Sequence, residues 1–359
     1  MAANRGETVM HPGATLGSVC LFSVEDRDFT VDDAIAAAAF RGEIGPWIDE
    51  VHRLLASEER DTQPSDPSLE PRVVKASEAF RYAHDLITAE ETEAWLRARG
   101  MTVQEFAAWF HLREAAETND GAAYSDEFVE RLPPLLRIHL WMTDAMEQLS
   151  EELRRRICAA TVLDEESGNI VPPPSTSPHP ARREELFLGI QRDPAWIEEM
   201  DRAETAYRTL QSRILTKESR EKLLRSFPLA YTRVEISSLE VDSEGAAREF
   251  FLATQTEGIP LSELAAEMGF RIEHSELWLD GVEEPLRQKL NSAAEGQTLA
   301  PAVAGNGFRI VQVIRKMSPD LSDPELRRRV DRRLTDGYFS ELTARLSRRE
   351  IQPLSVASR

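Results

Sequence analysis

The sequence contains little cysteine and no long apolar run. Its two cysteines, Cys20 and Cys158, are isolated, so they have neither the spacing of a metal site nor that of a redox pair. Isolated thiols are typical of a reducing compartment, and the N-terminus lacks the apolar segment of a secretory signal. No run approaches the roughly 18 apolar residues of a membrane span. We therefore expect a cytoplasmic protein that does not enter a membrane.

Basic residues are outnumbered by acidic ones. The chain has 43 Lys and Arg against 63 Asp and Glu, which gives a formal net charge of −20. Nucleic-acid binders normally carry a basic footprint, so nucleic acid is not an expected partner. The charge favours solubility and basic or neutral partners instead. With 41% hydrophobic residues in a chain of 359, we expect ordered cores in two or three domains.

Residue patterns that bind a metal or a cofactor are also missing. The sequence has no HExxH motif, no P-loop, no Rossmann fingerprint and no Ser–His–Asp order. Five histidines fall in predicted helices and strands, and none of them has the spacing of zinc ligands: His52, His84, His111, His139 and His274. We predict neither a metal nor a cofactor.

Residues 18–228 are predicted to form a mainly helical body. Three pairs have the spacing of helix-capping residues: Thr30 with Asp33, Thr88 with Glu91, and Thr102 with Glu105. The first 17 residues, 1–17, are predicted to be a flexible tail. Stretches rich in proline, serine and aspartate predict linkers near 60–71 and 164–181.

One predicted helix of this body carries an aromatic face. Phe106, Trp109 and Phe110 recur at the spacing of one helix side. Such a face is usually core between helices, and it can also line a peptide groove. Both interpretations stay open at this point, and Trp109 is a candidate peptide contact.

The pattern changes near residue 231, where "YTRVEISSLEV" alternates with a period of two. Helices, a weak strand, a further helix and a final strand follow it in the sequence. Residues 229–318 are therefore predicted to be a small α+β domain. Together with the helical body, this places the whole chain in the α+β class.

Residues 319–359 are predicted to contain one long amphipathic helix. Its apolar stripe consists of Leu326, Val330, Leu334, Tyr338, Leu342 and Leu346. Because so apolar a surface needs cover, we expect this helix to join the helical body and to pack on its helices over 30–57 and 72–117. Its many arginines are expected to meet acidic residues of the body; the alternative is a docking surface for an acidic leader peptide.

Residues 231–317 resemble a parvulin-type peptidyl-prolyl isomerase domain. The family closes with Gly-Glu, then Pro-Val, then Gly-aromatic-His-Ile, where this chain has Gly296-Gln297, Pro301-Ala302 and Gly307-Phe308-Arg309-Ile310 without insertion. A helical body, a parvulin module and a final helix follow one another as in SurA-type chaperones. The stretch "FRYAHDLITAEETEAWLRARGMTVQEFAAWF" is similar to a parvulin-related group associated with maturation of ribosomally made peptides.

The resemblance also locates the pocket of the family, and several of its residues are replaced here. Ser238 and Arg309 take the places of the two paired histidines, Ala304 that of the hydroxyl and Leu286 that of an apolar phenylalanine. A guanidinium cannot replace a neutral imidazole in a hydrogen-bonded pair, so we predict that prolyl isomerase activity is lost. We expect Ser238 and Arg309 on neighbouring antiparallel strands, with the guanidinium of Arg309 at a carboxylate or in solvent.

The resemblance thus implies a SurA-like peptide-binding chaperone or peptide-presenting factor rather than an enzyme. Its expected partners are an extended or precursor peptide and a peptide-modifying enzyme. The candidate peptide contacts are Leu286, Trp278, Phe308, Arg309 and Trp109. The alternative is an enzyme that acts on peptides, either as a weak peptidyl-prolyl cis-trans isomerase or through a re-used pocket.

Overall fold

The structure, a computed structural model, describes residues 16–60, 68–117, 130–167 and 192–349. Their contacts divide the chain into unit 1, residues 1–211 with 339–359, and unit 2, residues 212–338. Most of the predicted tail and of the two predicted linkers lies outside the described residues. The domain boundaries that we placed before residue 229 and after residue 318 stay predictions.

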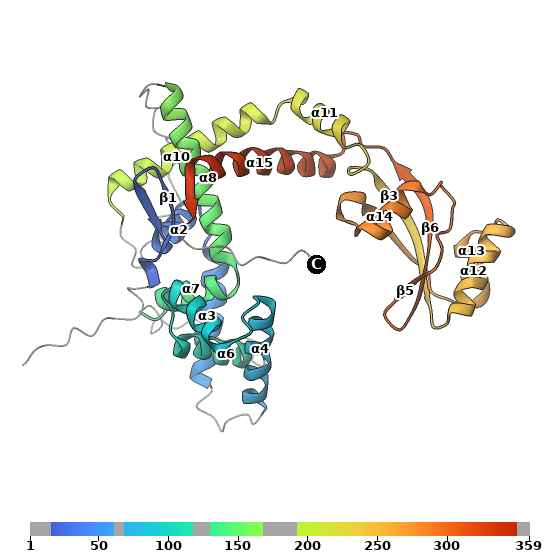
Figure 1. Ribbon diagram of the computed structural model, residues 1–359, viewed down its shortest axis with the longest axis horizontal. Helices are drawn as coiled ribbons and strands as arrows, with labels where there is room; N and C mark the ends of the chain where they lie inside the picture. Colours follow the sequence, from blue (N-terminus) through green and yellow to red (C-terminus); the bar gives the residue numbers. More distant parts are fainter. Residues whose placement is uncertain (1–15, 61–67, 118–129, 168–191, 350–359) are drawn as a thin grey trace, which may run out of the picture. The chain divides into compact units, whose positions relative to one another are not determined.

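Unit 1 is mainly helical (Figure 1), as predicted. Its helices are α2 (Val31–Phe40), α3 (Gly45–Arg60), α4 (Leu69–Ala83), α5 (Ala89–Ala98), α6 (Val103–Glu117), α7 (Leu132–Met142), α8 (Ala145–Ser167) and most of α10 (Pro194–Ile214). Capping boxes at Thr30 and Thr88 begin α2 and α5. Before α6, the hydroxyl of Thr102 accepts a hydrogen bond from the backbone N–H of Glu105 at 3.2 Å. The three predicted capping pairs are therefore confirmed.

Aromatic side chains form much of the core between α4, α5 and α6. The ring of Phe80 lies 5.5 Å from that of Trp95, 5.7 Å from that of Phe106 and 5.8 Å from that of Phe110. Trp109 packs edge-to-face on Phe110 and is only 1% exposed. Of the two interpretations of this face, the structure selects the core between helices.

The C-terminal part of the chain returns to unit 1. Strand β7 (Ser347–Arg349) pairs antiparallel with β1 (Cys20–Val24), which also pairs with β2 (Arg27–Thr30), so the sheet order is β2-β1-β7 (Figure 1). Near the end of α15 (Pro324–Leu346), the ring of Phe339 stacks on Tyr207 of α10 at 4.6 Å. Arg349 pairs with Glu151 of α8 at 2.9 Å. The predicted return to the helical body is confirmed from Phe339 onward, through β1, α8 and α10. The first part of the predicted stripe is covered within unit 2 instead, where Leu326 and Val330 pack with Tyr231. Packing on the helices over 30–57 and 72–117 stays a prediction.

Unit 2 is built around a four-stranded antiparallel sheet with the order β4-β3-β6-β5. Its strands are β3 (Arg233–Val241), β4 (Glu273–Trp278), β5 (Ala302–Ala304) and β6 (Gly307–Met317). The remaining elements are α11 (Lys217–Ser226), α12 (Glu244–Thr256), α13 (Leu261–Met268), the 3-10 turn η3 (Leu279–Gly281), α14 (Glu284–Ser292) and the first part of α15. The predicted α+β class is confirmed, although the short strand β5 was missed.

Alternation along β3 and β6 gives the sheet two apolar faces. On one face Leu239, Val241 and Ile310 pack against α12 and α13. On the other face Ile236, Val311 and Val313 pack against Leu290 of α14. Successive side chains of a strand point to opposite faces, so each strand serves both clusters.

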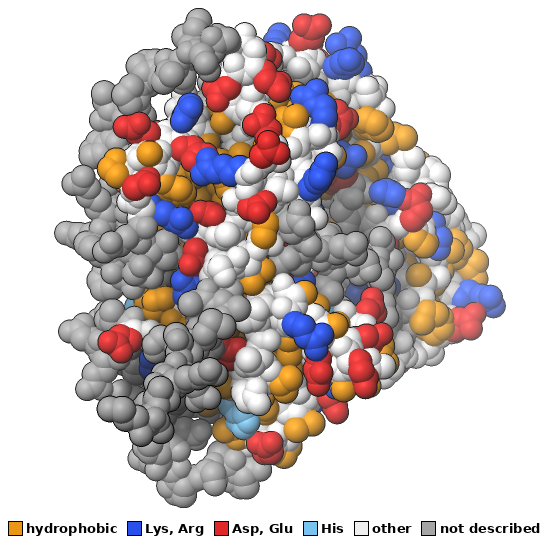
Figure 2. All heavy atoms as spheres, turned by 60° about the vertical axis from the view of Figure 1, so that its left-hand side comes forward, with side chains coloured by type: hydrophobic (Ala, Val, Ile, Leu, Met, Phe, Trp, Pro, Cys, Tyr) orange, Lys and Arg blue, Asp and Glu red, His pale blue; other side chains and the backbone are white. Residues whose placement is uncertain are grey.

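Charged side chains are mixed over the surface. In Figure 2, acidic and basic groups alternate over the visible face and do not gather into one basic patch. No helix among the described residues has the length and apolarity that crossing a membrane requires.

Candidate functional site

The two altered histidine positions lie on neighbouring strands of the unit 2 sheet, as predicted. Ser238 is in β3 and Arg309 in β6, and these strands pair antiparallel. In the register, Ser238 is opposite Val311, and Arg309 is opposite Glu240. Ser238 and Arg309 are therefore diagonal neighbours on one face, the face that α14 covers further along the strands.

The guanidinium of Arg309 has found a carboxylate, as we predicted. Its Nε donates a hydrogen bond to Oε1 of Glu240 at 2.9 Å. Both side chains are about half exposed, at 52% and 56%, whereas Ser238 is buried. A hydrated ion pair would have to lose water to receive an apolar proline ring, which costs free energy. This position is therefore poorly suited to a prolyl-binding pocket.

Two of the other predicted pocket residues, Ala304 and Leu286, lie on the same face of the sheet as Arg309, whereas Phe308 does not. Ala304 lies in the edge strand β5, opposite Gly307. Leu286 of α14 is half-buried against the cluster of Val311 and Val313. Phe308 follows the opposite orientation to Arg309 and packs with the cluster under α12 and α13.

The two candidate tryptophans also have other contacts. Trp278 donates from Nε1 to Oε1 of Glu325 at 2.9 Å, and guanidinium groups of Arg233 and Arg329 lie over its ring at 5.4 and 5.1 Å. Trp109 is in the core of unit 1. The five candidate peptide contacts therefore do not form one site. The sequence could not reveal this, since local patterns do not show which face of a strand or helix is buried.

A hydroxyl–imidazole pair that the sequence analysis missed lies on the other face of the sheet. Oγ of Ser237 is 2.9 Å from Nδ1 of His274, its cross-strand neighbour on β4. Such pairs activate nucleophiles in hydrolases. Ser237 is completely buried, however, so its hydroxyl is closed to a substrate carbonyl. The imidazole of His274 is exposed, so the pair lies at the edge of the buried region. Gln312, opposite Ser237 in the register of β3 and β6, hydrogen-bonds instead to the backbone of Leu261 and Gly296.

Unit 2 contains a cavity of about 410 Å³ with a basic lining, which the sequence did not reveal. Its apolar side is formed by Phe227, Ala230 and Tyr231, just after α11. Its charged side is formed by Arg287, Arg329, Arg332, Arg333, Asp280 and Asp336. The run of arginines in the sequence was the available signal, but the cavity depends on the segment after α11, η3 and α14 meeting α15.

The arginines of this basic cavity differ in their partners. Arg329 donates to both carboxylate oxygens of Asp280 at 3.0 and 3.1 Å, and Arg287 pairs with Glu284. Among the described residues, no carboxylate forms an ion pair with Arg332 or Arg333. Burial raises the pKa of the Tyr231 phenol, so this ring stays neutral beside them. The cavity therefore offers two guanidinium groups next to apolar surface.

The comparisons with known proteins come from solved structures. No family model matches this chain, and no curated protein does. Peptidylprolyl isomerase PrsA from Bacillus anthracis is 14% identical over 55% of this chain and 94% of its own, with a TM-score of 0.27. PrsA from Bacillus cereus is 12% identical over 64% of this chain and 88% of its own, with a TM-score of 0.32.

A third similar structure comes from Campylobacter jejuni, in work that describes PEB4 and the periplasmic protein Cj1289 as two SurA-like chaperones. It is 16% identical over 63% of this chain and 92% of its own, with a TM-score of 0.21. The solved structures thus belong to the two groups named in the sequence analysis, parvulin-type isomerases and SurA-like chaperones. At this level of similarity, no residue role passes from them to this chain.

Proposed function

We propose that this protein binds an extended peptide segment, as a chaperone or as a factor that presents a precursor peptide to a modifying enzyme, without catalysing prolyl isomerisation. The observation that carries the proposal is the basic cavity of unit 2, where Arg332 and Arg333 stand beside apolar surface. A peptide with acidic side chains fits this lining, since guanidinium groups bind carboxylates in bidentate fashion.

The apolar part of the cavity supports a peptide rather than a small anion. Phe227, which lines the cavity, is 55% exposed, and Leu229, which follows it in the chain but does not line the cavity, is 56% exposed. Such side chains can cover apolar groups of an extended chain while the arginines hold its carboxylates. In this proposal the client is the precursor of a ribosomally made peptide and the site of action is the cytoplasm; the two free cysteines are in keeping with that compartment.

The binding test compares two pairs of arginines on the same helix. The probe is an end-blocked acidic peptide, with a matched peptide in which Gln replaces each Glu. Changing Arg332→Gln and Arg333→Gln together should weaken binding of the acidic peptide by about tenfold or more, because charge-assisted hydrogen bonds are lost. Arg327→Gln with Arg328→Gln removes the same charge from exposed positions outside the cavity and should change affinity little.

Three results would contradict the proposal. These are equal affinity of the wild type for the acidic and the neutral peptide, equal loss in the two double variants, and tighter binding of a single-stranded oligonucleotide. The isomerase part is tested separately on a proline-containing tetrapeptide. In the presence of the protein, we expect the prolyl bond to isomerise at its uncatalysed rate. A rate enhancement that Arg309→Gln abolishes would contradict this part of the proposal.

A further inference from the structure

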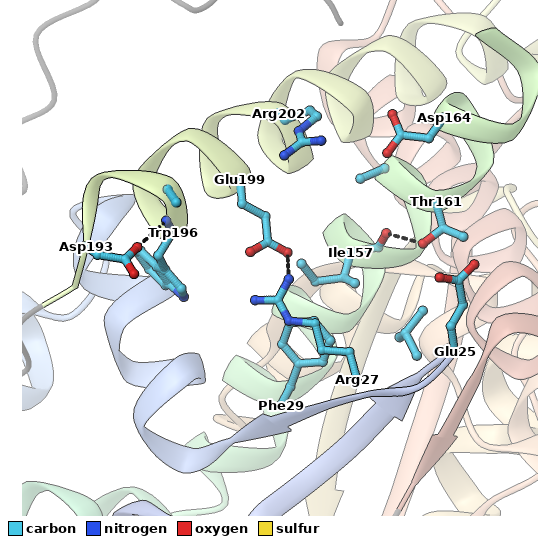
Figure 3. A pocket seen from close by; sticks show the side chains of 13 residues that line it. Glu25, Arg27, Phe29, Ile157, Thr161, Asp164, Asp193, Trp196, Glu199 and Arg202 are labelled. Atoms are coloured by element: carbon cyan, nitrogen blue, oxygen red, sulfur yellow. Dashed lines mark hydrogen bonds and ion pairs between the residues drawn. The ribbon is translucent and has the colours of Figure 1, made fainter. Parts of the chain in front are cut away.

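Unit 1 has a second cavity, of opposite charge, with a volume of about 530 Å³ (Figure 3). It lies between the turn of the β1–β2 hairpin, the C-terminal half of α8 and the first turns of α10. This volume falls in the range of about 300–1,000 Å³ that is usual for ligand sites. None of the residues considered for peptide binding in the sequence analysis lines it.

Local structure places several residues that line this acidic cavity. Asp193 accepts a hydrogen bond from the backbone N–H of Trp196 at 2.8 Å and so begins α10. Glu25, an exposed lining residue, has a positive φ of 53° in the tight turn between β1 and β2. Phe29 and Trp196 supply aromatic surface and are themselves 2% and 8% exposed.

The cavity already holds one guanidinium group, which comes from the chain itself. Arg27 lies over the ring of Phe29, with 4.9 Å between its Cζ and the ring centroid, and pairs with Glu199 across the cavity (Figure 3). A guanidinium between an aromatic face and a carboxylate combines cation–π attraction with an ion pair. The lining therefore accommodates a guanidinium group.

Two carboxylates remain after these contacts are assigned. Glu199 is paired with Arg27, and Asp193 caps α10, whereas Glu25 and Asp164 have no ion pair with a described residue. Arg202 is the remaining cation of the lining, so acids exceed bases. A metal ion is the less suitable occupant, because the described residues contain no group of three or more potential metal ligands.

We propose that this cavity binds a basic side chain of a peptide, with Glu25 and Asp164 as the carboxylates that receive an arginine head group. Trp196 and the apolar stem of Arg27 offer surface to the residues next to that arginine. Arg202 lines the cavity from α10, whereas Asp164 lines it from α8. Because Arg202 would repel a second basic side chain, the residue next to the bound arginine should be uncharged or acidic. The site is separate from the basic cavity, so it adds a second specificity to the protein.

The test uses the full-length protein and two labelled ten-residue peptides of glycine and serine. Their ends are blocked, and their central pair is Phe-Arg in one and Phe-Gln in the other. Binding is measured by fluorescence anisotropy at low ionic strength. The affinity for the Arg peptide should exceed that for the Gln peptide by about tenfold, which is the contribution of one charge-assisted contact. In the double variant Glu25→Gln with Asp164→Asn, the ratio of the two affinities (Arg peptide to Gln peptide) should fall to about one.

Two further variants separate the site from general charge and from misfolding. Glu165→Gln removes an exposed acid next to Asp164 that does not line the cavity, and it should keep the preference for the Arg peptide. Asp164→Lys should instead prefer a third peptide with Phe-Glu at its centre, a gain that a misfolded protein cannot produce.

The outcomes decide the proposal in either direction. A wild-type ratio of one, a ratio unchanged in the double variant, or an equal loss in Glu165→Gln would overturn it. Arg332→Gln with Arg333→Gln should leave the ratio intact. If free agmatine or Mg²⁺ at the peptide's own concentration abolished the preference, the site would be one for free cations, and the proposal would be wrong.

Discussion

The two units differ in the kind of polar group that they bury. Buried side chains of unit 1 include five ionisable ones, which are Arg99, Glu114, His139, Arg154 and Arg156. In the described part of unit 2 the buried polar side chains are all neutral, namely Ser237, Ser238, Thr254, Thr298, Gln312 and Thr335. Unit 2 keeps its charges at the surface, in pairs such as Arg309 with Glu240 and in the basic cavity.

This difference shows how each unit meets the cost of burying polar groups. In unit 1, Arg156 pairs with Glu204 at 2.7 Å, and the guanidinium of Arg99 lies over the rings of Trp95 and Trp141. In unit 2, Gln312 satisfies backbone groups through a neutral network. Buried ions need partners and respond to pH, whereas neutral networks do not. The stability of unit 1 should therefore depend more strongly on ionisation states between pH 4 and 7 than that of unit 2.

The largest effect is expected at Glu151, where several ion pairs of unit 1 meet. Its carboxylate pairs with Arg154, Arg155 and Arg349. Burial alone would raise the pKa of Glu151, but these guanidinium groups lower it. Glu151→Gln leaves the buried Arg154 without a described carboxylate, and should lower the free energy of unfolding by about 3–5 kcal/mol. Urea unfolding followed by tryptophan fluorescence measures this, since five of the six tryptophans are in unit 1.

The next largest effect is a pH dependence of the free energy of unfolding, caused by His139. Burial, with a smaller contribution from Arg113 and Arg53, lowers its pKa from 6.5 to about 4. The unfolded chain therefore binds the proton more readily, so stability is complete above pH 6.5 and falls as the pH drops towards 4. One pKa unit corresponds to about 1.36 kcal/mol, which makes the loss up to about 3 kcal/mol.

The variant His139→Leu isolates this effect, because the raised pKa of His84 acts in the opposite direction and is present in both proteins. We expect the unfolding free energies of wild type and variant to converge or cross as the pH falls from 7 to 4. Parallel curves over that interval would show that His139 is not buried neutral.

The smallest effect is expected from Glu240→Gln in unit 2, which makes the same chemical change as Glu151→Gln. It breaks the half-exposed pair with Arg309, and exposed pairs contribute less than about 1 kcal/mol. Hydrogen exchange of β3 and β6, measured by mass spectrometry, should be almost unchanged. A loss as large as that of Glu151→Gln would remove the contrast between the units.

The structure also separates what local patterns predict from what they miss. The capping pairs at Thr30, Thr88 and Thr102 were predictable, because each depends on residues three positions apart. Strands β5 and β7 were missed, since each is only three residues long and is defined by its partner strand. Neither has a periodicity of its own that a sequence pattern could reveal.

For the candidate site, the residues alone identify the chemistry of single positions. Serine at 238, arginine at 309 and the arginine-rich last helix follow from the residues alone. The fold was needed to show that Trp109 is core, that Phe308 and Arg309 face opposite ways, and that two cavities of opposite charge exist. A helix cap or a strand period depends on neighbours in the chain, so a local pattern reveals it. A cavity depends on side chains brought together from distant segments, such as Glu25 and Asp164.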